Sequence, residues 1–273
     1  MIMKKYSGLI LFLAVTLMGC EDVIELDLDE GEARIAIEGI VTDQPGPYTV
    51  TITESVGFYE DNVFPPISGA FVEISDDQGN AEVLVETEDG LYQTTDLQGQ
   101  RGVTYTLTVE HEGQTYTAQS RMPEEQVAID SLGFRFEEES LLNKEGYYFK
   151  AYFEDPPGLG DYYSFNVFIN GEVYVFDFDG EMIEDDNFWL YSDKYTDGNA
   201  QDYDFPHTLE EGDDVYVELR HLEKSTYDYY RMLVDVIDGG GVAPSNPISN
   251  FGDTALGYFG AFSVSNIEAT VEE

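Results

Sequence analysis

Regularly spaced turn residues divide this chain into short segments with the side-chain alternation of β-strands. Residues 48–53 alternate apolar side chains with threonines, a period of two that predicts a half-buried strand. Asn170-Gly171 and His111–Gln114 each separate two such segments, as the turns of β-hairpins do. Strands at intervals of roughly 8–12 residues are typical of sandwiches. The sequence therefore predicts an all-β protein made of antiparallel sandwiches.

The predicted strands form two regions on either side of a junction at residues 123–131. Residues 34–122 are expected to form an Ig-like antiparallel sandwich. Residues 123–273 are expected to form a second β-rich, sandwich-like region. The predicted strands cover residues 35–41, 48–53, 71–74, 83–85, 105–109, 115–118, 147–153, 162–169, 173–178 and 215–219.

One helix is expected in the second region, near residues 225–238. Ser225 is a good N-cap residue, and Asp228 follows three positions later in a capping-box arrangement. Apolar residues then recur at helical spacing as far as Ile237. The glycines at 239–241 favour an end to the helix there.

The charge of the chain excludes one class of partner. Lys and Arg together number 12 against 56 Asp and Glu, for a formal net charge of −44. Nucleic acid is not expected to bind, because its phosphates need basic side chains to neutralise them. The 20 tyrosines and 17 phenylalanines supply a core and argue against disorder.

The N-terminus predicts export and lipidation. Lys4 and Lys5 precede the apolar residues 9–18, a run too short to cross a bilayer of about 30 Å. Such a run behind a basic start is typical of a signal peptide, here residues 1–19. Cys20 is the only cysteine and follows Gly19, so we expect cleavage before it and attachment to the lipid bilayer through lipid on this cysteine. The acidic residues 20–33 are then expected to form a tether, and the alternation of Ile24, Leu26 and Leu28 with acids also fits a first strand.

Several segments, in their order and spacing, resemble one protein family. The resemblance is to a family of Bacteroidota outer-membrane lipoproteins of unknown function, often encoded near TonB-dependent receptors. Residues 68–122 also resemble a carboxypeptidase-regulatory, transthyretin-like module. The segments that carry the family resemblance are residues 20–22, 37–42, 46–48, 68–72, 105–107, 155–163, 245–248 and 256–259.

The resemblance implies a location and a partner. In this bacterial group, acids directly after the lipidated cysteine direct a lipoprotein to the cell surface, and Glu21, Asp22 and Glu25 match that signal. A solvated tether would have the same composition. The expected function is that of a non-enzymatic, surface-exposed outer-membrane lipoprotein that assists a TonB-dependent receptor in nutrient uptake. The alternatives are a calcium-assisted glycan or peptide adhesin and, third, an envelope hydrolase.

Catalytic patterns are missing from the sequence. Its three histidines, His111, His207 and His221, are not part of an HExxH motif, and no G-x-S-x-G elbow is present. The resemblance supplies no catalytic residues. We therefore expect that the protein is not an enzyme and requires no cofactor.

Calcium is the sharper alternative for the acidic residues. Asp193 and Asp197-Gly198 resemble the first half of an EF-hand loop, and Asp202 and Asp204 follow. Hard cations take six or more oxygen ligands, which such acids supply. Acidic loops on an acidic protein would give the same pattern without a metal.

Aromatic residues near these acids are the candidate contact surface for the partner. Trp189 is the only tryptophan, and Tyr191, Tyr203 and Phe205 follow in what we expect to be loops. Trp and Tyr are enriched among residues that dominate binding energy. The competing interpretation, which we favour slightly for Trp189, is packing in the core of the second sandwich.

Overall fold

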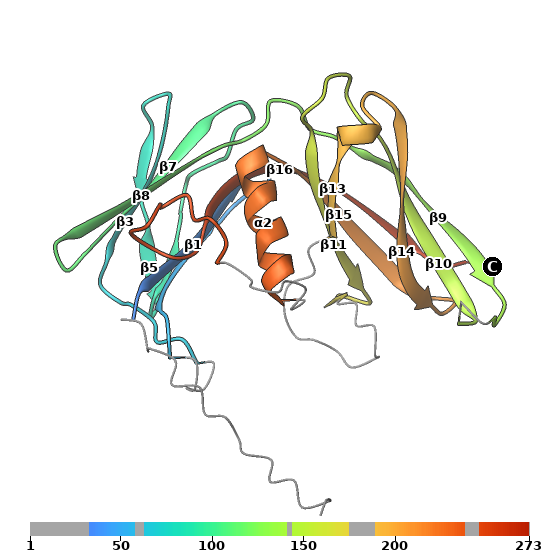
Figure 1. Ribbon diagram of the computed structural model, residues 1–273, viewed down its shortest axis with the longest axis horizontal. Coiled ribbons are helices and arrows are strands. Elements are labelled where there is room, and N and C mark those ends of the chain that lie inside the picture. The colour runs from blue at the N-terminus through green and yellow to red at the C-terminus, as the bar shows by residue number, and fades with distance from the viewer. Residues whose placement is uncertain (1–32, 58–62, 141–143, 175–188, 238–245, 273) are drawn as a thin grey trace, which may run out of the picture. The chain divides into compact units, whose positions relative to one another are not determined.

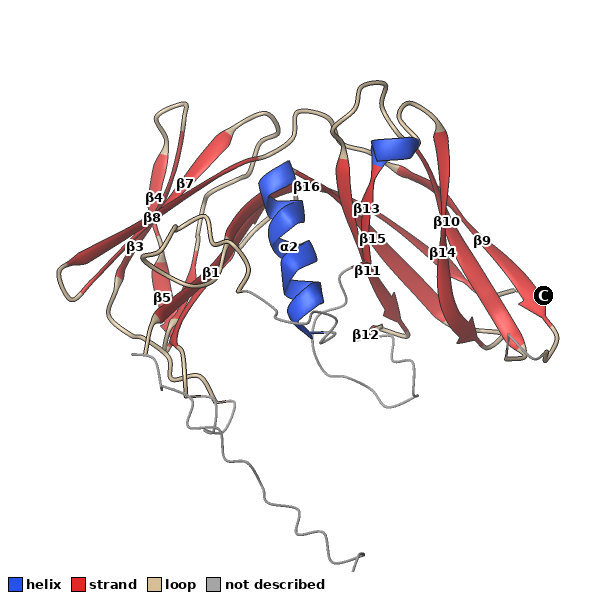
Figure 2. Cartoon of the chain, in the orientation of Figure 1, coloured by secondary structure: helices blue, strands red, loops and turns tan. Residues whose placement is uncertain are grey.

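The computed structural model describes residues 33–57, 63–140, 144–174, 189–237 and 246–272 (Figure 1). Among them, strands predominate and one α-helix is present, so the predicted all-β sandwich class is confirmed (Figure 2). No described helix is long and apolar enough to cross a membrane. The signal peptide at 1–19, Cys20, Glu21, Asp22, Glu25 and nearly all of the tether at 20–33 lie outside the described residues.

The strands of the first region match most of the predicted segments. They are β1 (Ile35–Thr42), β2 (Thr49–Glu54), β3 (Phe71–Asp76), β4 (Ala81–Val83), β5 (Val85–Glu88), β6 (Leu91–Gln93), β7 (Thr104–His111) and β8 (Gln114–Arg121).

The second region contains the remaining elements. They are β9 (Ile129–Glu137), β10 (Gly146–Glu154), β11 (Tyr162–Ile169), β12 (Glu172–Val173), β13 (Trp189–Ser192), the 3₁₀ helix η1 (Asp193–Tyr195), β14 (Ala200–Leu209), β15 (Asp214–Leu222), α2 (Lys224–Ile237) and β16 (Phe259–Thr270).

Three sheets are formed by these strands. The largest has nine strands, in the order β12-β11-β15-β16-β1-β2-β6-β5, with β13 also pairing with β11. A four-stranded sheet has the order β4-β3-β7-β8, and a three-stranded sheet has the order β14-β10-β9. The named strands pair antiparallel except for β1 and β16, which run parallel.

The C-terminal strand β16 joins the two halves of the nine-stranded sheet. Residues 259–262 pair with β1, whereas residues 263–270 pair with β15. The segment between β8 and β9 runs along the same strand, since Gln126 donates to the Val264 carbonyl at 2.6 Å and Ser265 donates to the Val127 carbonyl at 2.8 Å. Strand β16 therefore holds the junction predicted at residues 123–131.

Each half of the large sheet is covered by one of the smaller sheets. Side chains from β1, β2, β3 and β7 form one core, and Phe259 and Ala261 of β16 contribute to it. A second core lies between β11, β15 and the three-stranded sheet. The first core thus contains residues from far beyond the boundary predicted at residue 122, and that boundary stays a prediction.

Helix α2 packs on the middle of the large sheet (Figure 2). Its Tyr227 and Tyr230 contact a third, smaller core that contains Phe262 and Val264 of β16. The helix begins at Lys224, so Ser225, the predicted N-cap, lies inside the first turn. The Tyr227 amide donates to the Glu223 carbonyl at 3.1 Å, which marks Glu223 as the residue before the first turn.

Candidate functional site

Two acidic loops lie side by side at one end of the second core. The first, residues 155–161, follows β10, and the second, residues 193–199, follows β13. Strand β10 pairs with β14, and β11 pairs with β13. The first loop, between β10 and β11, therefore lies next to the second loop, which connects β13 to β14. Pro156 and Pro157 cannot donate to a ladder, which favours the end of β10 at this point.

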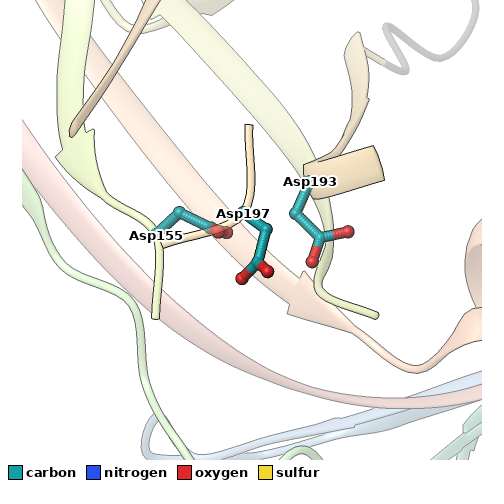
Figure 3. A group of neighbouring side chains, drawn as sticks. All are labelled: Asp155, Asp193 and Asp197. Atoms are coloured by element: carbon teal, nitrogen blue, oxygen red, sulfur yellow. The ribbon is translucent and has the colours of Figure 1, made fainter. Parts of the chain in front are cut away.

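Three carboxylates from these loops face one another. One oxygen from each of Asp155, Asp193 and Asp197 lies within 4.8 Å of the others (Figure 3). Asp155 and Asp193 are buried, 4% and 2% exposed, whereas Asp197 is exposed. Two unit charges about 5 Å apart repel by roughly 3 kcal/mol at an effective dielectric constant of about 20. Hydrogen-bond donors are therefore needed to stabilise the three carboxylates so close together.

Asp155 receives two such donors. The Tyr163 hydroxyl donates to Oδ1 at 2.6 Å, and the Gly198 amide donates to Oδ2 at 2.9 Å. Burial raises the pKa of Tyr163, and the neighbouring Asp155 carboxylate raises it further, so the phenol keeps its proton and remains a donor. Tyr163 thus fixes the orientation of a buried carboxylate.

The other two carboxylates bind amides of the opposite loop. The Gly160 amide donates to Asp193 Oδ2 at 2.7 Å, and the Gly158 amide donates to Asp197 Oδ1 at 2.6 Å. Each loop therefore supplies amide donors to carboxylates of the other. These bonds clasp the two loops together and leave further lone pairs on each carboxylate.

A histidine–aspartate pair lies beside this group. His221 is buried, and its Nε2 lies 2.9 Å from Asp161 Oδ1. Its Nδ1 lies 2.8 Å from the Glu125 carbonyl, which only accepts, so Nδ1 carries a proton. Burial raises the pKa of Asp161, and the charges of Asp155 and Asp193 add to this, while His221 opposes it. The 2.9 Å contact between Nε2 and Asp161 Oδ1 is a hydrogen bond with the proton on either atom.

The three-carboxylate group has the chemistry of a hard-cation site. Calcium takes six to eight oxygens at about 2.3–2.6 Å, and Asp155, Asp193 and Asp197 offer carboxylate oxygens that lie within 4.8 Å of one another. The amide bonds described above also stabilise the same carboxylates without a metal. Both interpretations fit the geometry.

Two of the four predicted metal ligands lie elsewhere. Asp202 and Asp204 are on β14 and not in a loop, and Asp204 forms ion pairs with Lys150 at 2.8 Å and Arg135 at 2.7 Å. Asp202 also pairs with Lys150. The structure brings Asp193 and Asp197 together with a residue that the sequence did not single out, Asp155.

The signal for Asp155 was weak in the sequence. Asp155 precedes Pro156 and Pro157, a pattern that predicts a turn. The pattern does not indicate that the Asp155 carboxylate belongs to a binding site. Its partners Asp193 and Gly198 come about 40 residues later, and only the strand pairing places them next to it. The acid cluster is thus a product of topology.

The predicted partner-contact residues belong to the second core. Phe205 is 1% exposed and stacks on Phe149 with ring centroids 4.6 Å apart. Trp189, Tyr191 and Tyr203 are half-buried and pack against the same core. The packing interpretation given for Trp189 fits this position, and Phe205 offers almost no surface to a partner. A partner contact through Trp189, Tyr191 or Tyr203 stays a prediction.

The fold and the clasped acidic loops define an all-β protein with two sandwiches that share one sheet and carry a candidate cation site. The chain belongs to the family described as Domain of unknown function (DUF4249), whose model matches residues 21–268. No curated protein matches the chain.

Proposed function

We propose that this chain is a non-enzymatic, surface-exposed outer-membrane lipoprotein that assists a TonB-dependent receptor in nutrient capture and uptake. The observation that carries the proposal is the apolar run that ends at Gly19-Cys20, followed by Glu21 and Asp22. The resemblance to receptor-linked lipoproteins supplies the partner. The family to which the chain belongs is described as one of unknown function and names no role.

The lipid anchor is tested by metabolic labelling with palmitate. Label is expected on the wild type and not on the Cys20→Ala variant, because Cys20 is the residue expected to carry the lipid. Equal labelling of both proteins would contradict the anchor.

Surface exposure is tested by adding protease to intact cells. The wild type should be degraded, and a variant with Glu21, Asp22 and Glu25 replaced by Ala should be protected. A matched variant with Asp27, Asp29 and Glu30 replaced by Ala removes the same number of charges further from the cysteine and should still be degraded. Protection of the wild type until cells are broken would place the protein in the periplasm.

The receptor is tested by co-purification. An anchor in the same membrane raises the effective concentration of the lipoprotein near an integral partner. A tagged wild-type protein in mild detergent is expected to recover one TonB-dependent receptor in near-equal amount, and Cys20→Ala is expected to recover much less. Recovery of the lipoprotein alone, under conditions that preserve known receptor–lipoprotein complexes, would overturn the uptake role.

A calcium-assisted glycan or peptide adhesin is the second candidate, and the convergence of Asp155, Asp193 and Asp197 favours it. Calcium should raise the melting temperature of the wild type more than magnesium does, because magnesium requires a smaller octahedral site. Asp197 is exposed, and the Asp197→Asn variant should lose the difference between calcium and magnesium. The Asp202→Asn control, on β14, should keep that difference. Equal effects of the two ions on the wild type would contradict a calcium site.

A further inference from the structure

A pocket of about 320 Å³ lies between helix α2 and the large sheet, away from the acidic loops. One wall is formed by Tyr229, Tyr230 and Leu233 of α2. The facing strands contribute Glu38 of β1, Asn166 of β11 and Arg220 of β15. Its volume is at the lower end of the roughly 300–1,000 Å³ that ligand pockets occupy, so a small ligand would fill it.

The walls of the pocket combine rigid aromatic rings with aliphatic groups. Tyr229 is 9% exposed and stacks on Tyr258 at 4.5 Å between ring centroids, which holds both rings in place. Tyr230 packs edge-to-face on Tyr229 at 5.8 Å. Phe168 of β11 also lines the pocket. Such walls favour a ligand with at least one apolar face.

The positive charge of Arg220 is already balanced. Arg220 Nη2 lies 3.1 Å from Glu218 Oε2, and its guanidinium lies over the Phe262 ring at 5.2 Å. Asn166, with its amide oxygen turned to Arg220, accepts from Nη1 at 3.1 Å. An anion would have to displace these partners and approach a chain of net charge −44. A cation would meet the fixed guanidinium of Arg220 as well as the carboxylate of Glu38.

A wholly apolar ligand is also disfavoured. It would cover the guanidinium of Arg220, the carboxamide of Asn166 and the carboxylate of Glu38, and it would offer no hydrogen bonds in return. What fits is a small, uncharged molecule with an apolar face and a rim of donors and acceptors. The rings of neutral sugars have this chemistry, with a C–H face for the aromatic wall and hydroxyl groups for planar polar side chains.

We propose that the pocket between α2 and the large sheet binds a neutral mono- or disaccharide. The apolar face of the sugar lies against Tyr230 and Phe168, and its hydroxyl groups bind the carboxylate of Glu38 and the polar groups at Arg220 and Asn166. That this sugar is the captured nutrient depends on the proposed uptake function, whereas its binding does not.

Binding is tested with the full-length protein, solubilised in a detergent without sugar headgroups. Saturation-transfer NMR is recorded with glucose, galactose, mannose, xylose, N-acetylglucosamine, lactose and cellobiose. At least one of them should bind saturably. If none does, or if amino acids or fatty acids compete for the same pocket, the proposal is wrong.

Three variants locate the site. Tyr230→Ala removes the aromatic wall and Leu233→Trp fills the pocket, and each should weaken sugar binding by about tenfold or more. Tyr227→Ala is the control, because Tyr227 is a half-buried tyrosine of the same helix that packs on Tyr162 at 5.0 Å and does not line the pocket. Its affinity should stay within about twofold of wild type. An equal loss in all three variants would overturn the location.

The two proposals fail separately. Receptor co-purification without sugar binding would leave the uptake role in place and remove this ligand. Saturable sugar binding that Tyr230→Ala abolishes, without a co-purified receptor, would establish the pocket and remove the uptake role. Circular dichroism melting of each variant confirms that it is folded.

Discussion

Phe205 shows how a single aromatic side chain ties the second sandwich together. It stacks on Phe149 of β10, meets Trp189 of β13 edge-on at 5.7 Å and meets Phe165 of β11 edge-on at 5.6 Å. Two sheets are therefore joined through one ring. Aromatic pairs contribute about 0.5–1.5 kcal/mol each beyond the burial of their area.

Replacing Phe205 by Ala should consequently destabilise the protein by about 3–5 kcal/mol in urea unfolding, the usual cost of removing a buried phenylalanine. Tyr195→Ala is the control, because Tyr195 is 87% exposed in the nearby 3₁₀ helix and should change stability by no more than about 0.5 kcal/mol. Similar values for the two variants would mean that Phe205 is not a core residue.

The same strand corrects the expectation that Asp202, Asp204, Tyr203 and Phe205 lie in loops. In β14 the acids Asp202 and Asp204 alternate with Tyr203 and Phe205, so acids face solvent and aromatics face the core. That alternation is the signal of a half-buried strand and was available in the sequence. The strand also contains Pro206, which is tolerated because β14 is an edge strand.

Asp161 should make the protein less stable as pH rises. Its pKa is raised, by burial first and then by Asp155 and Asp193, so the folded state favours its protonated form. Its stabilising contribution is complete below the ordinary value of 3.8 and is lost as pH rises through the folded pKa. Asn resembles the protonated acid, so Asp161→Asn should gain stability relative to wild type over this range, in urea unfolding with a chelator present.

Asp204 provides the control of opposite sign. Burial alone would raise its pKa, but the bonds to Lys150 and Arg135 outweigh burial and lower it below 3.8. Its contribution is present above that value and is lost as pH falls through the folded pKa. Asp204→Asn should therefore be less stable than wild type at neutral pH, and the two should converge in acid. The same pH trend for both variants would contradict the assigned causes.

At the level of elements, local signals were sufficient for the hairpins. Asn170 and Gly171 adopt φ values of 54° and 81° between β11 and β12, as the Asn-Gly pair predicts. Glu112 and Gly113 adopt 49° and 80° between β7 and β8, where a turn was also predicted. These two hairpins could therefore be predicted from the local sequence, without knowledge of tertiary contacts.

Strand β16 required tertiary information. Residues 259–264 are all buried because this stretch is covered on both faces, by the first core and by α2. A strand covered on both faces has no polar–apolar alternation, and a short apolar run does not distinguish strand from helix. Its parallel pairing with β1 also joins residues more than 200 positions apart, a distance at which no local pattern acts.

Gly257 tests the joint between β16 and β1. It has a φ of +86°, and a Cβ there would lie 2.2 Å from the Ile37 carbonyl oxygen, in the segment where Leu256 and Tyr258 bind β1. Gly257→Ala should therefore be far less stable than Gly252→Ala. Gly252 has a φ of +65°, and a Cβ there would have no atom within 4 Å. The Gly252→Ala variant therefore pays only the cost of the left-handed backbone, about 1–2 kcal/mol. Urea unfolding compares them, and equal costs would argue against a close joint.

For the whole molecule, charge is the dominant global property. The net charge of −44 has few cations to offset it, and several of these already pair with acids, such as Arg135 and Lys150 on the three-stranded sheet. Self-repulsion destabilises a compact state that carries such a charge. At Asp155, Asp193 and Asp197 this repulsion is offset locally, because backbone amides and the Tyr163 phenol donate hydrogen bonds to the carboxylates.

Salt should therefore raise the melting temperature of the protein. The Debye length falls from about 30 Å at 0.01 M to about 3 Å at 1 M, which screens repulsion between acids on different strands and loops. Sodium chloride and choline chloride at equal ionic strength should act alike if screening is the cause, because the bulky choline ion is a poor ligand for carboxylate clusters. A rise with sodium alone would indicate bound cations, and no rise with either salt would show that acid–acid repulsion does not limit the stability of this fold.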